Sequence, residues 1–139
     1  MSITLPHNYR PTEREPFMNA LQQEYFRQKL QKWKGELIEE SNQTLQNMQE
    51  ESLAQPDLAD RATAETDRSL ELRTRDRFRK LISKIDQALK SIDDGSYGYC
   101  EETGEPISLK RLEARPIATL SVEAQERHER LERTRRDEA

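Results

Sequence analysis

The residues with the most evident chemistry surround the single cysteine, in the stretch GYCEETGEPI at 98–107. A zinc knuckle needs a Cys-x-x-Cys pair in a glycine-containing turn, because a structural zinc ion takes four thiolate or imidazole ligands. Here Cys100 fills the first position, but Thr103 stands where the second thiolate belongs. The stretch LSVEA at 120–124, where a second pair would lie, has no cysteine. The pattern indicates half of a metal knuckle without the ligands to hold a metal.

A second group of candidate residues consists of two carboxylates, Asp57 and Asp60, directly after Pro56. Proline ends the preceding element, and aspartate is a favoured N-cap residue. Carboxylates in this position also interact with the positive end of the helix dipole. Taken alone, the residues favour a capping role for this pair, and a binding role stays open beside it.

Composition limits the classes of protein to consider. Of the 139 residues, 36% are charged and 32% hydrophobic, which suits long amphipathic helices better than a compact globule. The net charge of -4 argues against DNA binding by phosphate neutralisation, and no sequence-specific DNA binding is expected. One cysteine fits a reducing compartment, and no apolar run is long enough to span a membrane, so the protein is expected to be cytoplasmic.

Two stretches have the period of an amphipathic helix. In the first, which begins at Phe17, the expected seam is Phe26, Leu30, Trp33, Leu37, Thr44 and Met48. In the second, expected from about Leu58 to Ile92, the seam is Phe78, Leu81, Ile85, Ala88 and Ile92. Two long helices with seams of the same period and a short link predict an antiparallel coiled-coil hairpin.

The chain is therefore expected to have four segments. Residues 1–16, with three prolines, form an extended N-terminal arm, and residues 17–94 form the hairpin, with its tip near 53–61. Residues 95–120 form a small globular region like a degenerate zinc finger, and residues 121–139 form a C-terminal helix with a charged tail. Gly95 is expected to end the second long helix and Ser121 to cap the last one.

Several of these segments resemble the DksA/TraR family of RNA polymerase-binding transcription factors. The resemblance is carried by DLADRA (57–62), SLELRTRDRFRKLISKI (69–85), GYCEETGEPISLKRLEARP (98–116) and the helix after Ser121, and it covers roughly residues 17 to 130. It implies a mostly α fold: a long antiparallel coiled-coil hairpin, a small zinc-finger-like head and a C-terminal helix. It also implies that the hairpin enters the secondary channel of RNA polymerase, in the β′ subunit. There it destabilises promoter open complexes, an effect that the alarmone ppGpp strengthens.

The resemblance assigns roles to particular residues. Asp57 and Asp60 match the acidic tip that approaches the polymerase active centre, and Ala62 matches a small residue just behind it. Arg77, Leu81, Lys84 and Arg115 match the factor's side of a ppGpp site, and Gln125 replaces a lysine of that site, which implies a weaker alarmone response.

The alternative for three of these residues is a purely structural one. In it, Leu81 belongs to the hairpin seam, and Arg77 and Lys84 pair with Glu36, Glu39 or Glu40 of the other helix.

Four zinc-binding cysteines are typical of the family head, and here the corresponding positions are Cys100, Thr103, Ser121 and Ala124. These side chains cannot complete a tetrahedral zinc site, so no metal is expected. Packing must then hold the head together, and the expected core is Tyr97, Tyr99, Ile107, Leu109, Leu112, Ile117 and Leu120. Cys100 is interpreted as the remnant of a ligand set, with a redox sensor as the alternative.

The resemblance implies a monomeric transcription regulator of the stringent response with RNA polymerase and ppGpp as partners, and the sequence predicts no catalytic activity of its own. No nucleophile–base pair or phosphate-binding loop is visible. A Gre-like transcript-cleavage or elongation factor and a coiled-coil adaptor are the alternative functions.

Overall fold

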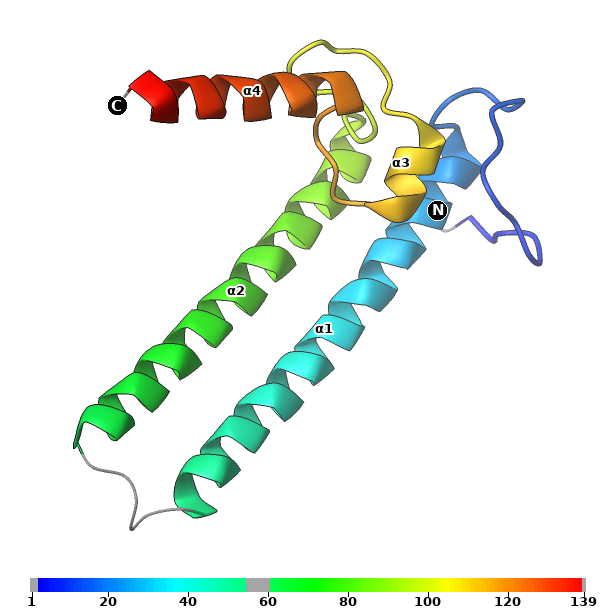
Figure 1. Ribbon diagram of the computed structural model, residues 1–139. Helices are drawn as coiled ribbons and strands as arrows, with labels where there is room; N and C mark the ends of the chain where they lie inside the picture. The colour runs from blue at the N-terminus through cyan, green and yellow to red at the C-terminus, as the bar shows by residue number, and fades with distance from the viewer. Residues whose placement is uncertain (1–2, 55–60, 139) are drawn as a thin grey trace. The chain divides into compact units, whose positions relative to one another are not determined.

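The chain is mostly helical, as the sequence predicts. The computed structural model describes residues 3–54 and 61–138. In this range lie α1 (Ala20–Ala54), α2 (Arg61–Asp94), α3 (Leu109–Ala114) and α4 (Val122–Glu138), as Figure 1 shows. The only bridge of β type in this part of the chain joins Tyr99 and Pro106.

Two compact units share the two long helices. The stem is Gln31–Gln87, and the head combines the residues up to Leu30 with those from Ala88 onward. This grouping differs from the four segments expected from the sequence. The N-terminal arm, the first turns of α1 and the last turns of α2 pack with the region after residue 95, so they form one unit with it.

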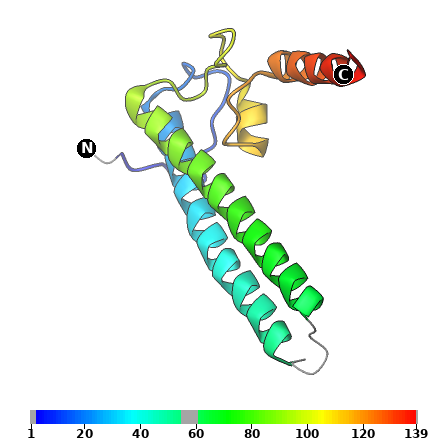
Figure 2. The ribbon, with the colours of Figure 1, turned by 90° about the vertical axis from the view of Figure 1, so that its left-hand side faces the viewer.

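In the stem, α1 and α2 run side by side in opposite directions, as the views in Figures 1 and 2 agree, and they form the predicted helical hairpin. Its buried seam includes Leu37, Leu45, Phe78 and Ile85, and Ile85 is fully buried. Leu45, rather than the expected Thr44, is the buried residue of that turn. It lies eight residues after the buried Leu37, which is two steps of four residues along the same face of α1.

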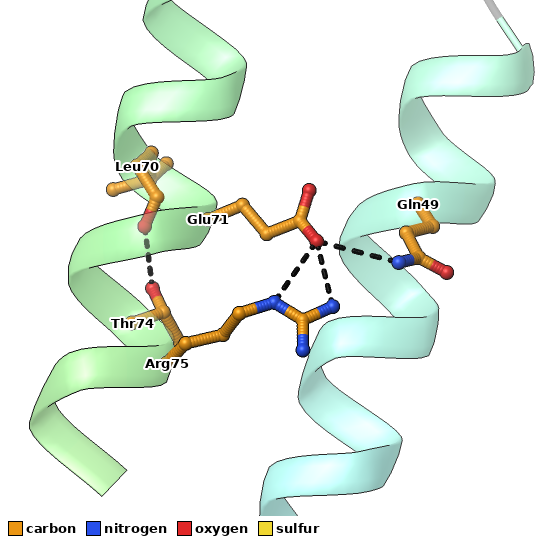
Figure 3. Close-up of polar contacts among 5 residues, drawn as sticks. All are labelled: Gln49, Leu70, Glu71, Thr74 and Arg75. Carbon is orange, nitrogen blue, oxygen red and sulfur yellow. Dashed lines mark hydrogen bonds and ion pairs between the residues drawn. The ribbon is translucent and has the colours of Figure 1, made fainter. Parts of the chain in front are cut away.

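The seam also contains polar contacts, which Figure 3 shows. Gln49 on α1 donates a hydrogen bond from Nε2 to the Glu71 carboxylate on α2 at 3.3 Å. Arg75 donates to the same oxygen from Nη2 at 2.9 Å. The hydrogen bonds from Arg75 and then Gln49 hold the pKa of Glu71 below its usual range. Exposed pairs of this kind stabilise a hairpin much less than buried leucine or isoleucine does.

The first long helix begins at Ala20, three residues later than the periodicity suggested. Asn19 is its N-cap, since its Oδ1 accepts the Gln22 N–H at 2.9 Å. Met18 has a φ of 56°, a left-handed conformation that no α-helix can continue. The side chain of Gln22 accepts the Met18 N–H at 2.7 Å, which completes a variant of the capping box.

The N-terminal arm is not extended, in contrast to the prediction. Backbone N–H groups of Tyr9, Glu15 and Asn19 donate to the carbonyls of Pro6, Thr12 and Pro16 and so form successive turns. The prolines that suggested an extended arm are therefore turn residues. In the part of the chain that the structure describes, no helix is both long and apolar enough to cross a lipid bilayer.

The stem seam can be tested at its fully buried position. Replacing Ile85 with alanine should lower the free energy of unfolding by about 3 kcal/mol, because it removes buried methyl groups and leaves a cavity. Urea denaturation followed by circular dichroism measures this loss. Ile38, which is 43% exposed, is the matched control, and its alanine variant should lose under about 1 kcal/mol. Equal losses at both positions would contradict the seam.

Candidate functional site

The loop around Cys100, here called the knuckle (residues 98–107), is closed by its own backbone. The N–H of Cys100 donates to the Glu105 carbonyl at 2.8 Å, and the N–H of Gly104 donates to the Cys100 carbonyl at 2.9 Å. The Ile107 N–H donates to the Gly98 carbonyl at 2.7 Å. Gly98 and Gly104 have φ values of 91° and 74°, which residues with a side chain rarely adopt. The glycines thus permit a turn as tight as that of a metal knuckle.

The side chain of Cys100 is buried in the head and only 2% exposed. Burial opposes its ionisation, but hydrogen bonds outweigh this effect and lower its pKa to about 6. The donors are the Thr103 hydroxyl and the backbone N–H groups of Ser121, Thr103 and Glu102. Ser121 comes from the segment where the second metal-binding pair would lie. Cys100 is therefore mostly a thiolate at neutral pH, and donors from both segments converge on its sulfur.

The other residues at the expected metal positions have different roles. Thr103 Oγ1 accepts the Glu105 N–H at 3.2 Å, and Ser121 Oγ accepts the Ala124 N–H at 3.2 Å as the N-cap of α4. Ala124 is fully buried and has no donor atom to offer. Within residues 3–54 and 61–138, no group of three or more His, Cys, Asp or Glu side chains could hold a metal ion. The residues present do not fit a tetrahedral zinc site.

A polar cluster links α3 to α1. Glu113 on α3 accepts hydrogen bonds from the Tyr25 hydroxyl at 2.9 Å and from Lys29 Nζ at 2.8 Å. Burial works against the ionised form of Glu113, but the bonds from Lys29 and Tyr25 outweigh it and lower its pKa. Burial and the bond to Glu113 raise the pKa of Tyr25 to about 12. The sequence alone does not predict this cluster, because no local pattern links residues more than eighty positions apart.

The predicted head core is correct in part. Tyr97, Ile107, Leu109 and Leu112 are buried, and the Tyr97 hydroxyl donates to the Pro116 carbonyl at 2.8 Å. Ile117 and Leu120 are half-buried. The expectation for Tyr99 is wrong, since this side chain is 38% exposed and packs edge-on against Phe17 at 5.4 Å between ring centroids. Three small buried side chains were not expected in the core: Cys100, Ala118 and Ala124.

The stem carries three of the residues expected at a ppGpp site. Arg77 is exposed, with its guanidinium 5.8 Å from the centre of the Phe78 ring, Leu81 is half-buried and Lys84 is exposed. In the described part of the chain, neither Arg77 nor Lys84 pairs with a glutamate of α1. The ion pair between the helices here joins Lys34 and Asp86 at 2.7 Å. The structural alternative for these two cations is therefore not observed.

Arg77 also belongs to a mostly basic groove along α2. The groove has a volume of about 540 Å³, and its lining includes Arg68, Leu72, Arg73, Asp76, Arg77 and Lys80. Leu72 is 58% exposed.

The remaining predicted site residues lie either in the head or outside the residues that the structure describes. Arg115 is exposed at the C-cap of α3, and Gln125 on α4 donates to Glu129 at 3.3 Å. These two belong to the head, whereas Arg77, Leu81 and Lys84 belong to the stem. Asp57 and Asp60 lie outside the described residues. Ala62 is in the first turn of α2, and its side chain is also outside the description.

Comparison with known proteins gives the family. Residues 22–92 match the N-terminal domain of DnaK suppressor protein DksA, and residues 95–130 match the prokaryotic dksA/traR C4-type zinc finger. The chain belongs to the DksA family. Its match to a C4-type finger covers a stretch that holds only one cysteine, so this DksA head departs from the four-cysteine pattern.

Individual DksA proteins agree with this assignment. The chain is 69% identical over 131 residues to the RNA polymerase-binding transcription factor DksA of Caulobacter vibrioides, covering 94% of this chain and 92% of that protein. It is 45% identical over 115 residues to the DksA of Escherichia coli K12, covering 83% and 76% of the two chains. The solved structure of transcription factor DksA2 from Pseudomonas aeruginosa aligns with a TM-score of 0.66 at 39% identity, over 84% of this chain and 90% of that one.

The lowered pKa of Cys100 predicts how the stability of the protein depends on pH. Folding lowers the pKa of Cys100 from 9.0 to about 6, so its contribution is complete above about pH 9 and is lost as the pH falls toward 6. The free energy of unfolding, measured with urea under reducing conditions at pH 6, 7.5 and 9, should therefore rise with pH. Cys100→Ala should flatten this rise, while every other titrating group stays the same. An identical pH dependence in both proteins would show that the sulfur is not stabilised as a thiolate.

Proposed function

We propose that this chain binds RNA polymerase through the secondary channel and regulates transcription initiation, without catalytic activity of its own. The observation that carries the proposal is the 69% identity, across 94% of the chain, to a protein named for its binding to RNA polymerase. The helical hairpin supports it, because two long packed helices are a suitable shape for reaching into a channel. The proposal includes a monomer acting in the cytoplasm through the β′ subunit, without sequence-specific DNA binding.

In this proposal the link between α1 and α2 acts near the polymerase active centre. Asp57 and Asp60 bring two carboxylates into a site that holds magnesium, nucleotide phosphates and basic side chains. Negative charge there changes the local field and the arrangement of those groups. Ala62, just behind, leaves room for the approach. Promoter open complexes that are already unstable then dissociate faster.

The alarmone ppGpp is the proposed co-regulator, bound where the factor meets the polymerase. Arg77 and Lys84 are exposed cations without an ion-pair partner among the described residues, which leaves both free to bind diphosphate groups. Leu81 lies one turn from Arg77 on the same face, and Arg115 adds a cation from the head. Gln125 can donate a hydrogen bond but has no charge, so the response to ppGpp is weaker than with a lysine there.

Independence from zinc is part of the same proposal. Cys100, Thr103, Ser121 and Ala124 offer one thiolate, two hydroxyls that are already hydrogen-bonded and a methyl group. The protein is therefore proposed to fold and act without the metal that the C4-type family finger takes.

The role of the link is tested by transcription from a ribosomal RNA promoter in vitro. The double variant Asp57→Asn, Asp60→Asn should inhibit transcription at least about tenfold less than wild type and still bind polymerase. Both amides keep the shape of the side chain and remove its charge. Asp67→Asn, an exposed carboxylate on α2, is the matched control and should act as wild type. Full inhibition by the double variant would refute the role of the tip. Strong stimulation of transcript cleavage in backtracked complexes would favour a Gre-like factor instead.

The ppGpp site is tested by the same assay with and without the alarmone. The double variant Arg77→Ala, Lys84→Ala should keep its basal inhibition and lose most of the increase that ppGpp causes. Arg79→Ala removes a cation from the same helix at a side chain that is 80% exposed and serves as the control. Gln125→Lys should increase the response, because it restores a cation next to the phosphates. An unchanged ppGpp effect in the Arg77 and Lys84 variant would place the alarmone elsewhere.

A further inference from the structure

The N-terminal segment 5–19, here called the strap, is anchored by a buried amide. Gln22 on α1 is fully buried, and its side chain accepts the Met18 N–H at 2.7 Å and donates to the Thr12 carbonyl at 3.2 Å. Its third contact, at 3.4 Å, is with Glu15. All partners of this buried amide lie in the strap. Release of the strap would break all of these hydrogen bonds.

Glu15 connects the strap to the rest of the head. Its carboxylate accepts hydrogen bonds from the Tyr9 hydroxyl at 2.5 Å and from Asn19 at 3.2 Å, and the bond from Tyr9 is the main reason that its pKa lies below the usual range. The Tyr9 ring packs edge-on against Tyr25 with centroids 6.1 Å apart. Tyr25 in turn donates to Glu113 on α3. One connected set of contacts thus runs from the strap through α1 to α3.

The strap also lies directly against the knuckle. Phe17 packs on Tyr99, and a Cβ atom at Gly98 would come within 2.8 Å of Met18 Cε. Phe17 also lines a small cleft with Ile107, the last residue of the knuckle, and Leu109, the first residue of α3. Met18 is only 7% exposed although its backbone is left-handed, so packing and the bond to Gln22 compensate the strain of that conformation.

We propose that the strap holds the knuckle closed in this chain, the task that a metal ion performs in a four-cysteine head. Two observations support this directly. The donors at the knuckle do not fit zinc, and the strap contacts the knuckle, α1 and the tyrosine bonded to α3 at the same time. Release of the strap is then the local opening that exposes Cys100. This inference concerns the head alone and does not depend on the proposed function.

Cys100 itself reports on this opening, because it is the only thiol in the chain and is 2% exposed. Its rate of reaction with Ellman's reagent at pH 8, without denaturant, measures how often the head opens. Tyr9→Phe keeps the ring and removes one hydrogen bond, so the rate should rise about fivefold. Gln22→Leu removes every side-chain hydrogen bond of the anchor and should raise the rate more than tenfold. Gln28→Leu makes the same change at an exposed position of α1 and should stay within about twofold of wild type.

Global unfolding is separated from strap release by the stem variant Ile85→Ala, which weakens the hairpin and leaves the strap intact. Strap variants that react faster than this variant, despite a smaller loss of global stability, support the proposal. Wild-type reaction rates in Tyr9→Phe and Gln22→Leu would overturn it. An Ile85→Ala rate that rises as much as theirs would also overturn it. If Gln22→Leu does not fold, the comparison of the reaction rates of Tyr9→Phe and Gln28→Leu decides the question.

Discussion

The head of this protein depends on how a single sulfur atom is surrounded by hydrogen-bond donors. Cys100 is buried, and the donors come from its own turn and from Ser121, about twenty residues away in the chain. A metal ion would join these two segments through its positive charge. Here backbone N–H groups and the Thr103 hydroxyl around the sulfur contribute to this link, together with the strap proposed above. The remaining closure comes from side chains far away in the sequence.

The stem and the head differ in the interactions that stabilise them. The stem is held by a narrow apolar seam in which Ile85 is fully buried, with polar contacts such as that of Gln49 with Glu71 in addition. Its outer surface can therefore carry many charges, including the basic groove beside Leu72, although the chain as a whole is acidic. The head contains most of the buried apolar side chains, among them Phe26, Leu30 and Leu112, and it also encloses the polar side chain of Gln22, whose hydrogen bonds are satisfied.

Local patterns predicted the features that depend on neighbouring residues. Helical periodicity predicted the hairpin, and Gly95, with a φ of 86°, and Ser121 act as the expected helix end and cap. The start of α1 could not be predicted, because the left-handed Met18 is stabilised by a contact with Gln22 rather than by its own preferences. The link between Glu113 and α1 was also missed, since long-range pairs leave no local signal. The residues proposed for the tip and for the ppGpp site come from the family resemblance alone, and no pattern in this chain by itself identifies them.

Hydrogen exchange of single backbone amides tests most directly whether the head closes without a metal. The N–H groups of Cys100, Gly104 and Ile107 are the ones that close the knuckle, and they can be followed by NMR in protein exhaustively treated with a chelator. Protection of these amides by at least about 100-fold, unchanged when zinc is added, is the expected result. Amides that exchange freely in the chelated protein and become protected only with zinc would contradict this description of the head.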